Sequence, residues 1–112
     1  MAAGTYNFTL EQGSTFSRQI TVQENGTALN LTGYTARMQM RSTHDSSTIA
    51  LTYTSTIASP ASNGIVNLSA TATQSAAIEE GIYVYDLEIE SSGGVVTRLM
   101  EGKVTVTPEV TR

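Results

Sequence analysis

The sequence predicts an all-β fold, specifically an Ig-like antiparallel β-sandwich with one short helical turn. Apolar and polar residues alternate with the period of two that is typical of strands with one buried face. Turn-forming clusters separate these runs every 8 to 12 residues or so, a spacing typical of sandwiches and barrels. The chain has 112 residues, the size of one such domain. We therefore expect a single domain over residues 1–112.

Seven runs are expected to form strands. The clearest covers residues 34–41, where Tyr34, Ala36, Met38 and Met40 fall on one face and polar residues fall on the other. The remaining runs share this alternation and cover residues 8–10, 15–22, 49–54, 65–68, 83–90 and 103–107. A pattern with one buried and one solvent-exposed face indicates an antiparallel sheet rather than a parallel one.

The inward positions of these runs predict the core. In residues 49–54 the alternation places Ile49, Leu51 and Tyr53 on the inner face. Arg18 interrupts the inner set of its run and is expected near an open end of the sandwich. Nine side chains are expected to be largely buried, namely those of Phe16, Ile20, Tyr34, Met38, Leu51, Leu68, Tyr85, Leu87 and Val104.

Two short segments carry local turn or helix signals. Asn25 and Gly26 predict a type I′ hairpin turn, because both central residues of that turn need a positive φ. Residues 71–78 depart from the strand period. There Thr73 is expected to cap one helical turn over residues 74–77, because its hydroxyl can accept an otherwise unpaired backbone N–H.

The Ser-Ser-Gly-Gly segment that ends at Gly94 predicts the register of the last hairpin. A three-residue loop with Gly94 in the left-handed region gives a type I turn followed by a bulge. That register places Leu87 opposite Leu99 and Glu88 opposite Arg98. It pairs apolar with apolar and acid with base, as cross-strand contacts favour.

The alternation changes parity further along the last strand. Leu99 and Val104 are both expected to face inward, yet they are an odd number of positions apart. In a regular strand an odd spacing places two side chains on opposite faces. We therefore expect a β-bulge at Glu101 and Gly102, since a bulge inserts one extra residue into a strand.

The composition excludes several protein classes. The chain is 39% hydrophobic and only 14% charged, with 18 Thr and 12 Ser, so hydroxyl groups provide much of its solubility. The absence of Cys excludes a disulfide scaffold and suits folding in a reducing cytoplasm. The net charge of −4 argues against nucleic acid as a partner. No apolar run approaches the ~20 residues that span a bilayer, and the start of the chain lacks signal-peptide features, so no membrane partner is expected.

No catalytic or cofactor-binding residue is predicted, and the chain is not expected to be an enzyme. Residues 44–47 set His44, an acid and two hydroxyls side by side. A catalytic triad needs these groups to converge from separate elements, which adjacent residues in a polar loop cannot do. Tyr34, Tyr83 and Tyr85 fall on inward faces, so core packing is expected in preference to a sugar-binding surface.

No metal site is predicted either. Asp86, Glu88 and Glu90 are spaced by two and share one face of a strand. Calcium sites usually wrap a loop and recruit backbone carbonyls, unlike three carboxylates along a strand. We therefore expect a solvated charged face on which Arg98 or Lys103 pairs with these acids across the ladder.

Two stretches go beyond a generic strand pattern. Leu-Thr-Gly-Tyr at residues 31–34 opens the strand that ends in Met-Gln-Met-Arg at 38–41. Gly-Ile-Tyr-Val-Tyr-Asp-Leu-Glu-Ile at 81–89 is followed, after a turn, by Arg-Leu-Met-Glu-Gly-Lys-Val-Thr-Val at 98–106. Together they resemble small structural proteins of the phage virion, found in the tail or baseplate, and in particular the N-terminal domain of phage upper baseplate proteins. We expect no coiled coil or receptor-binding head after Arg112, so the resemblance implies the adaptor fold alone.

This resemblance implies a structural virion protein of a bacteriophage. Such a protein would be an adaptor or attachment module of the tail, baseplate or neck, assembled in the host cytoplasm and located in the virion. Its implied partners are other virion proteins, copies of itself in a symmetric assembly, and a tail fibre. A capsid decoration protein is one alternative. A free carbohydrate-binding or adhesin-type β-sandwich is another, which the absence of Trp disfavours.

The two ends of the chain are the expected assembly contacts. Residues 1–5 are expected to form a flexible arm. At Pro108 the chain is expected to be confined to a sheet edge or to leave the sheet, because proline has no N–H for a ladder. The candidate contact residues form the C-terminal tail: Pro108, Glu109, Val110, Thr111 and Arg112.

Overall fold

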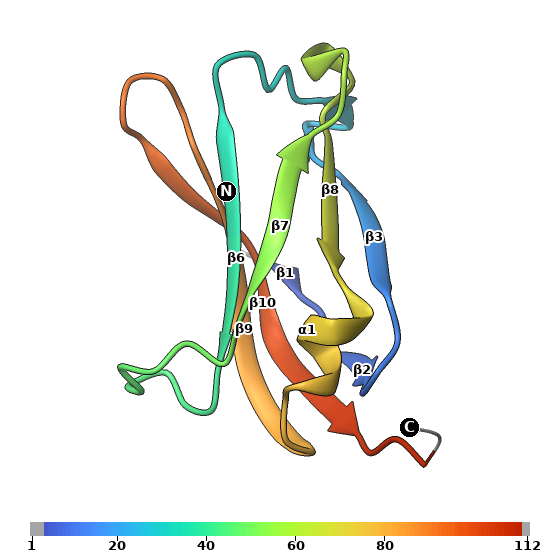
Figure 1. The fold of residues 1–112 in the computed structure, drawn as a ribbon. Coiled ribbons are helices and arrows are strands. Elements are labelled where there is room, and N and C mark those ends of the chain that lie inside the picture. Colours follow the sequence, from blue (N-terminus) through green and yellow to red (C-terminus); the bar gives the residue numbers. More distant parts are fainter. Residues whose placement is uncertain (1–3, 111–112) are drawn as a thin grey trace.

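The structure is a computed structural model that describes residues 4–110. Within that range the chain forms ten strands, one short α-helix and one 3₁₀ turn (Figure 1). In chain order they are β1 (Gly4–Thr5), β2 (Phe8–Glu11), β3 (Phe16–Thr21), β4 (Gln23–Glu24), β5 (Thr27–Ala28), β6 (Thr35–Arg41), β7 (Leu51–Ile57), the 3₁₀ turn η1 (Ala61–Asn63), β8 (Ile65–Ala70), α1 (Ala72–Ala76), β9 (Gly81–Glu90) and β10 (Val96–Thr107). No helix within residues 4–110 is long and apolar enough to cross a membrane.

Eight of the strands form one curled sheet. Its order is β1-β10-β9-β6-β7-β8-β3, and β2 pairs with β10 on the same side as β1. The sheet folds over at β7, because the first part of β7 pairs with β6 and its second part pairs with β8. Two layers result, which confirms the all-β sandwich with one short helix (Figure 1). The pairs β1–β10 and β2–β10 are parallel, so the sheet is not antiparallel throughout.

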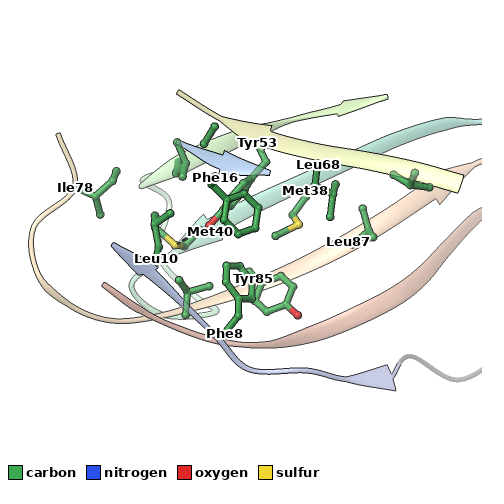
Figure 2. Close-up of a cluster of buried hydrophobic side chains, with 14 of the residues drawn as sticks. Phe8, Leu10, Phe16, Met38, Met40, Tyr53, Leu68, Ile78, Tyr85 and Leu87 are labelled. Atoms are coloured by element: carbon green, nitrogen blue, oxygen red, sulfur yellow. Dashed lines mark hydrogen bonds between the residues drawn. The ribbon is translucent and has the colours of Figure 1, made fainter. Parts of the chain in front are cut away.

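The core lies between the two layers and follows the predicted alternation. Phe8 and Phe16 stack at a centroid distance of 5.2 Å, and Tyr53 and Tyr85 meet Phe8 edge-on (Figure 2). Seven of the nine predicted core side chains are buried, namely those of Phe16, Met38, Leu51, Leu68, Tyr85, Leu87 and Val104. The other two are only half-buried, namely those of Ile20 and Tyr34.

The inward placement of Ile49 is wrong. Its side chain is 42% exposed, because β7 begins only at Leu51 and Ile49 still belongs to the preceding loop. Phe8 and Leu10, in contrast, lie on the buried face of β2 as the alternation predicts.

The hairpin between β9 and β10 confirms part of the predicted register. Gly94 has a φ of +87°, and Glu88 lies opposite Arg98. Leu87, however, lies opposite Met100, because the strand bulges at Leu99. The prediction of Leu87 opposite Leu99 is therefore wrong.

The predicted bulge at Glu101 and Gly102 is also wrong, since the register runs regularly through both residues. Gly102 has another role. A Cβ atom at this position would stand 2.2 Å from the carbonyl oxygen of Tyr6. Glycine therefore allows the N-terminal strand to pass close to β10, which is a general use of glycine inside strands.

Both local segments have the predicted type of structure. Asn25 and Gly26 have φ values of +53° and +79°, which confirms the type I′ turn between β4 and β5. The helix is capped by Thr71, so the prediction of a cap at Thr73 is wrong. The Thr71 hydroxyl accepts from the Gln74 N–H at 3.1 Å, while Gln74 Oε1 accepts from the Thr71 N–H at 2.8 Å. This reciprocal capping box satisfies two backbone donors that Thr73, already inside the helix, cannot reach.

Candidate functional site

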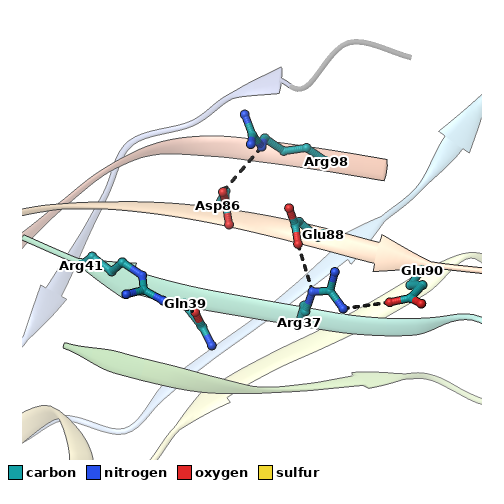
Figure 3. Close-up of polar contacts among 7 residues, drawn as sticks. All are labelled: Arg37, Gln39, Arg41, Asp86, Glu88, Glu90 and Arg98. Carbon is teal, nitrogen blue, oxygen red and sulfur yellow. Dashed lines mark hydrogen bonds and ion pairs between the residues drawn. The ribbon is translucent and has the colours of Figure 1, made fainter. Parts of the chain in front are cut away.

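One outer face of the sandwich carries a row of paired charges on β6, β9 and β10. Arg37 donates to Glu88 and to Glu90, each at 2.9 Å (Figure 3). Arg98 lies 3.5 Å from Asp86. The solvated charged face predicted for β9 is therefore confirmed, and so is the pairing by Arg98. Arg37 was missed as a partner because the sequence does not show that β6 lies beside β9.

A shallow polar depression of about 280 Å³ lies beside these pairs, and Arg41, His44, Asp86 and Glu101 are on its lining. Burial raises the pKa of the Asp86 carboxyl, and nearby Glu88 raises it further. No cluster of three or more His, Cys, Asp or Glu that could hold a metal occurs within residues 4–110. Among its lining residues Arg98 pairs with Asp86 and Glu101, whereas Arg41 donates to the Ser46 carbonyl and to Gln39.

The polar loop of residues 44–47 shows only local contacts for Ser46. Its hydroxyl donates to the Thr48 carbonyl and accepts from the Thr48 N–H, each at 3.2 Å. Its carbonyl accepts a hydrogen bond from Arg41 at 2.9 Å. These contacts hold the loop against the end of β6. They agree with a structural role for the loop.

The second layer of the sandwich is almost free of charge. Strands β7, β8 and β3 carry no carboxylate, and Arg18 is their one charged residue. Residues 46–78, which include β7, β8 and α1, contain no charged side chain at all. The exposed residues of this layer carry hydroxyl or amide groups, so we call the outer surface of β7, β8 and β3 the neutral face.

Strand β3 is an open edge of the sheet. It pairs only with β8, and across that ladder the Val22 N–H donates to the Gly64 carbonyl at 2.7 Å. Main-chain groups alternate in direction along an antiparallel strand. Those of Ser17, Gln19 and Thr21 therefore point away from β8, and all three side chains are exposed.

The ladder on the other side of β8 gives the same assignment. The Ala58 N–H donates to the Ile65 carbonyl at 2.9 Å, so the odd-numbered residues of β8 face β7. Its even-numbered residues consequently face β3. Their register partners are Phe16, Arg18 and Ile20, which leaves the odd-numbered residues of β3 on the open side.

A seam separates the β3 edge from β1 and β2, and Arg18 bridges it. The Arg18 guanidinium lies 5.7 Å from the ring centroids of Tyr6, Phe8 and Phe16. Arg18 was expected near an open end of the sandwich, but the structure places it within β3, at the seam between the two open edges of the sheet. Beside it is a groove of about 330 Å³, whose apolar lining residues include Ile20, Leu99 and Met100.

The C-terminal tail leaves the sheet at Pro108, one of the two outcomes expected there. Strand β10 itself is not an edge, because β9 pairs with one side of it and β1 and β2 pair with the other. The Glu109 N–H donates to Gln12 Oε1 at 3.0 Å, and Gln12 also donates to the Ile78 carbonyl at 2.6 Å. Val110 is 93% exposed. Thr111 and Arg112, the last two candidate contacts, lie outside the described residues.

The flexible arm expected over residues 1–5 is wrong at its last two residues. Gly4 and Thr5 form β1 and pair with Met100 and Glu101 of β10. Residues 1–3 lie outside the described residues.

The sequence did not identify β3 as the free edge, although one signal was present: residues 12–23 hold no charge except Arg18. A strand without charges lacks a common protection against edge pairing.

Comparisons with known proteins find a relationship in fold only. No family model matches the chain, and no curated protein matches it. Among solved structures, the chain is similar to CopC from Methylosinus trichosporium OB3b. The TM-score is 0.51 and the identity is 12%, over 100% of this chain and 90% of that chain. At this identity the similarity shows a shared sandwich fold and nothing about function.

Proposed function

We propose that this chain is a structural virion protein of a bacteriophage, an adaptor or attachment module of the tail, baseplate or neck. It acts through protein–protein contacts with other virion proteins and with copies of itself in a symmetric assembly. The resemblance of residues 31–41 and 81–106 to phage baseplate proteins supports this proposal. The layout of charge on the sandwich supports it independently.

The neutral face is the observation that carries the proposal. The chain has a net charge of −4, so copies that approach through their charged faces repel one another. Every carboxylate of residues 4–110 lies outside β7, β8 and β3. Neighbouring subunits can therefore cover this layer without burying an unpaired acid, which would be costly.

The tail provides a second contact. Val110 is an apolar side chain held almost fully in solvent, while Glu109 ties the segment to Gln12. This anchored, exposed segment suits insertion between neighbouring subunits. We assign the assembly contacts to the neutral face and to residues 108–112.

Incorporation into particles tests the proposal. Tagged chain is produced in host cells while they make the virus that encodes it, and purified particles are probed for the tag. We expect the parent to sediment with the particles. Thr54→Glu on the neutral face should reduce incorporation, and so should Val110→Glu or deletion of residues 108–112. Thr105→Glu is the matched control, because Thr105 is also exposed but lies on β10, in the other layer.

The outcomes separate the alternatives. Recovery with isolated heads, and not with tails, would indicate a capsid decoration protein instead. Binding of the purified parent to a glycan array, with no recovery in particles, would indicate a free carbohydrate-binding sandwich. Failure of every folded variant to reduce incorporation would contradict the assignment of the contacts.

A further inference from the structure

We infer that β3 is a self-association site at which two copies of this chain pair edge to edge and antiparallel, about a twofold axis at Gln19. The inference deepens the proposed function, on which it rests, by naming the site and the partner of one contact. Ser17, Gln19 and Thr21 turn main-chain donors and acceptors to the open side of β3. No hydrogen bond within residues 4–110 uses these groups, because the β3–β8 ladder takes the main-chain groups of the even-numbered residues of β3. A second β3 would supply partners for all of them.

The sequence of β3 complements itself in one antiparallel register. With Gln19 opposite Gln19 of the second copy, Ser17 lies opposite Thr21 and Arg18 lies opposite Ile20. All three outward residues are then paired, which gives about six main-chain hydrogen bonds. The hydroxyl pair and the amide pair are favourable cross-strand neighbours, and no like charges lie opposite each other.

Neighbouring registers are poorer. A shift of two residues in one direction places Arg18 opposite Arg18 of the second copy, and like charges in that position are unfavourable. A shift in the other direction places Ser17 opposite Gln23, which lies beyond the end of β3, so only Gln19 and Thr21 of the outward residues stay paired within the strand. The twofold register at Gln19 therefore pairs the whole open edge and avoids both conflicts.

Charge favours a second copy as the occupant. Two acidic chains repel across most of their surfaces, whereas residues 12–23 bring no carboxylate to the contact. The other open edge is less suited, because β2 carries Glu11 on its outward side. The groove beside β3 would receive Ile20 of the second copy against Leu99 and Met100, which adds apolar burial to the strand pairing.

A concentration series in analytical ultracentrifugation tests the inference. We expect the parent to show a monomer–dimer equilibrium. Gln19→Lys should raise the dimer Kd at least about tenfold, because it places two ammonium groups opposite each other. Thr105→Lys is the matched control and should leave the Kd within about twofold, since Thr105 is exposed on β10, which is paired on both sides. Circular dichroism and thermal unfolding verify that both variants fold.

Disulfide trapping tests the register. The chain has no Cys, so each single-cysteine variant carries one thiol. Gln19→Cys should form a covalent dimer, because directly paired residues bring their Cα atoms within about 5.5 Å. Ser17→Cys mixed with Thr21→Cys should cross-link as a heterodimer far faster than either variant alone. Thr105→Cys is the control for random collision, because Thr105 is exposed on β10, outside the proposed contacts.

Several results would overturn the inference. One is a monomeric parent together with no disulfide trapping of Gln19→Cys. Another is a dimer that Gln19→Lys does not weaken, or a partner other than a second copy at this edge. The last is trapping of Thr105→Cys as fast as that of Gln19→Cys. Particle incorporation of the parent, compared with its oligomeric state in solution, separates this inference from the proposed function. A monomeric parent that still enters particles refutes the self-pairing alone, whereas a dimer that never enters particles refutes the virion role alone.

Discussion

Arg18 donates a hydrogen bond to the Tyr6 hydroxyl across the seam between β3 and the N-terminal strands. The two residues come from opposite open edges of the curled sheet, so this contact closes the sandwich where no backbone ladder does. The guanidinium also lies over three aromatic rings at the end of the core. A single cation thus joins the polar seam to the apolar interior.

Replacement of Arg18 should destabilise the fold more than replacement of an ordinary surface arginine. We expect Arg18→Ala to cost about 1–2 kcal/mol, from the lost cation–π contacts and the lost packing of the side-chain stem. Arg98→Ala serves as the control and should cost about 1 kcal/mol or less, because the Arg98 ion pairs are exposed. Urea denaturation measures both. Equal costs would mean that Arg18 is only a surface charge.

Leu87 is the most informative core position on β9, since its side chain is fully buried. Leu87→Ala should lower the free energy of unfolding by about 2–5 kcal/mol, through lost burial and the cavity left behind. Ile82→Ala on the same strand should change it by about 0.5 kcal/mol or less, because Ile82 is 65% exposed. Similar melting temperatures for the two variants would contradict the assigned faces of β9.

Two glycines separate backbone strain from steric collision. Gly26 and Gly64 have φ values of +79° and +69°. A Cβ atom would meet nothing within 4 Å at Gly26, whereas at Gly64 it would stand 2.7 Å from the Val22 carbonyl oxygen. Gly26→Ala should therefore cost about 1–2 kcal/mol for the left-handed backbone alone. Gly64→Ala should cost clearly more in the same denaturation assay, and equal costs would argue against the close packing of Gly64.

Asp86 should make stability depend on pH in an unusual direction. Burial and Glu88 raise its pKa in the folded chain above the ordinary value of 3.8. The folded chain therefore binds the proton more tightly, so the stability contributed by this group falls as pH rises through the folded pKa. Asp86→Asn removes that loss. Its melting temperature relative to the parent should be higher at pH 7 than at pH 3, and no difference between the two pH values would contradict the shift.

Tyr85 should respond to alkaline conditions in the same sense. Burial raises its pKa to about 12, and its hydroxyl donates to the Tyr6 carbonyl at 2.5 Å. The unfolded chain loses this proton near pH 10, so stability should fall between about pH 10 and pH 12. Tyr85→Phe should flatten part of that fall in thermal unfolding at pH 8 to 11. If stability falls with pH equally steeply in Tyr85→Phe and in the parent, ionisation of this hydroxyl does not cause the loss of stability at high pH.

Features set by neighbouring residues could be predicted from the sequence. Alternation placed Met38, Leu87 and Val104 in the core, and Asn25-Gly26 specified a type I′ turn. The helix cap was open to the same reasoning, because Thr71 and Gln74 have the spacing of a capping box. That cap was assigned to the wrong threonine although the signal was local.

The sequence by itself determined which face of each strand is buried, because the two-residue period is a property of one strand. Only the tertiary structure decided which strands are neighbours. It placed β10 inside the sheet and left β3 open, it paired Arg37 with Glu88, and it put the bulge at Leu99. Strand pairing joins residues far apart in the chain, and the two-residue period of one strand does not indicate which other strand lies beside it. The proposed interaction surface depends on such pairings, since an edge exists only where the folded sheet provides no neighbour.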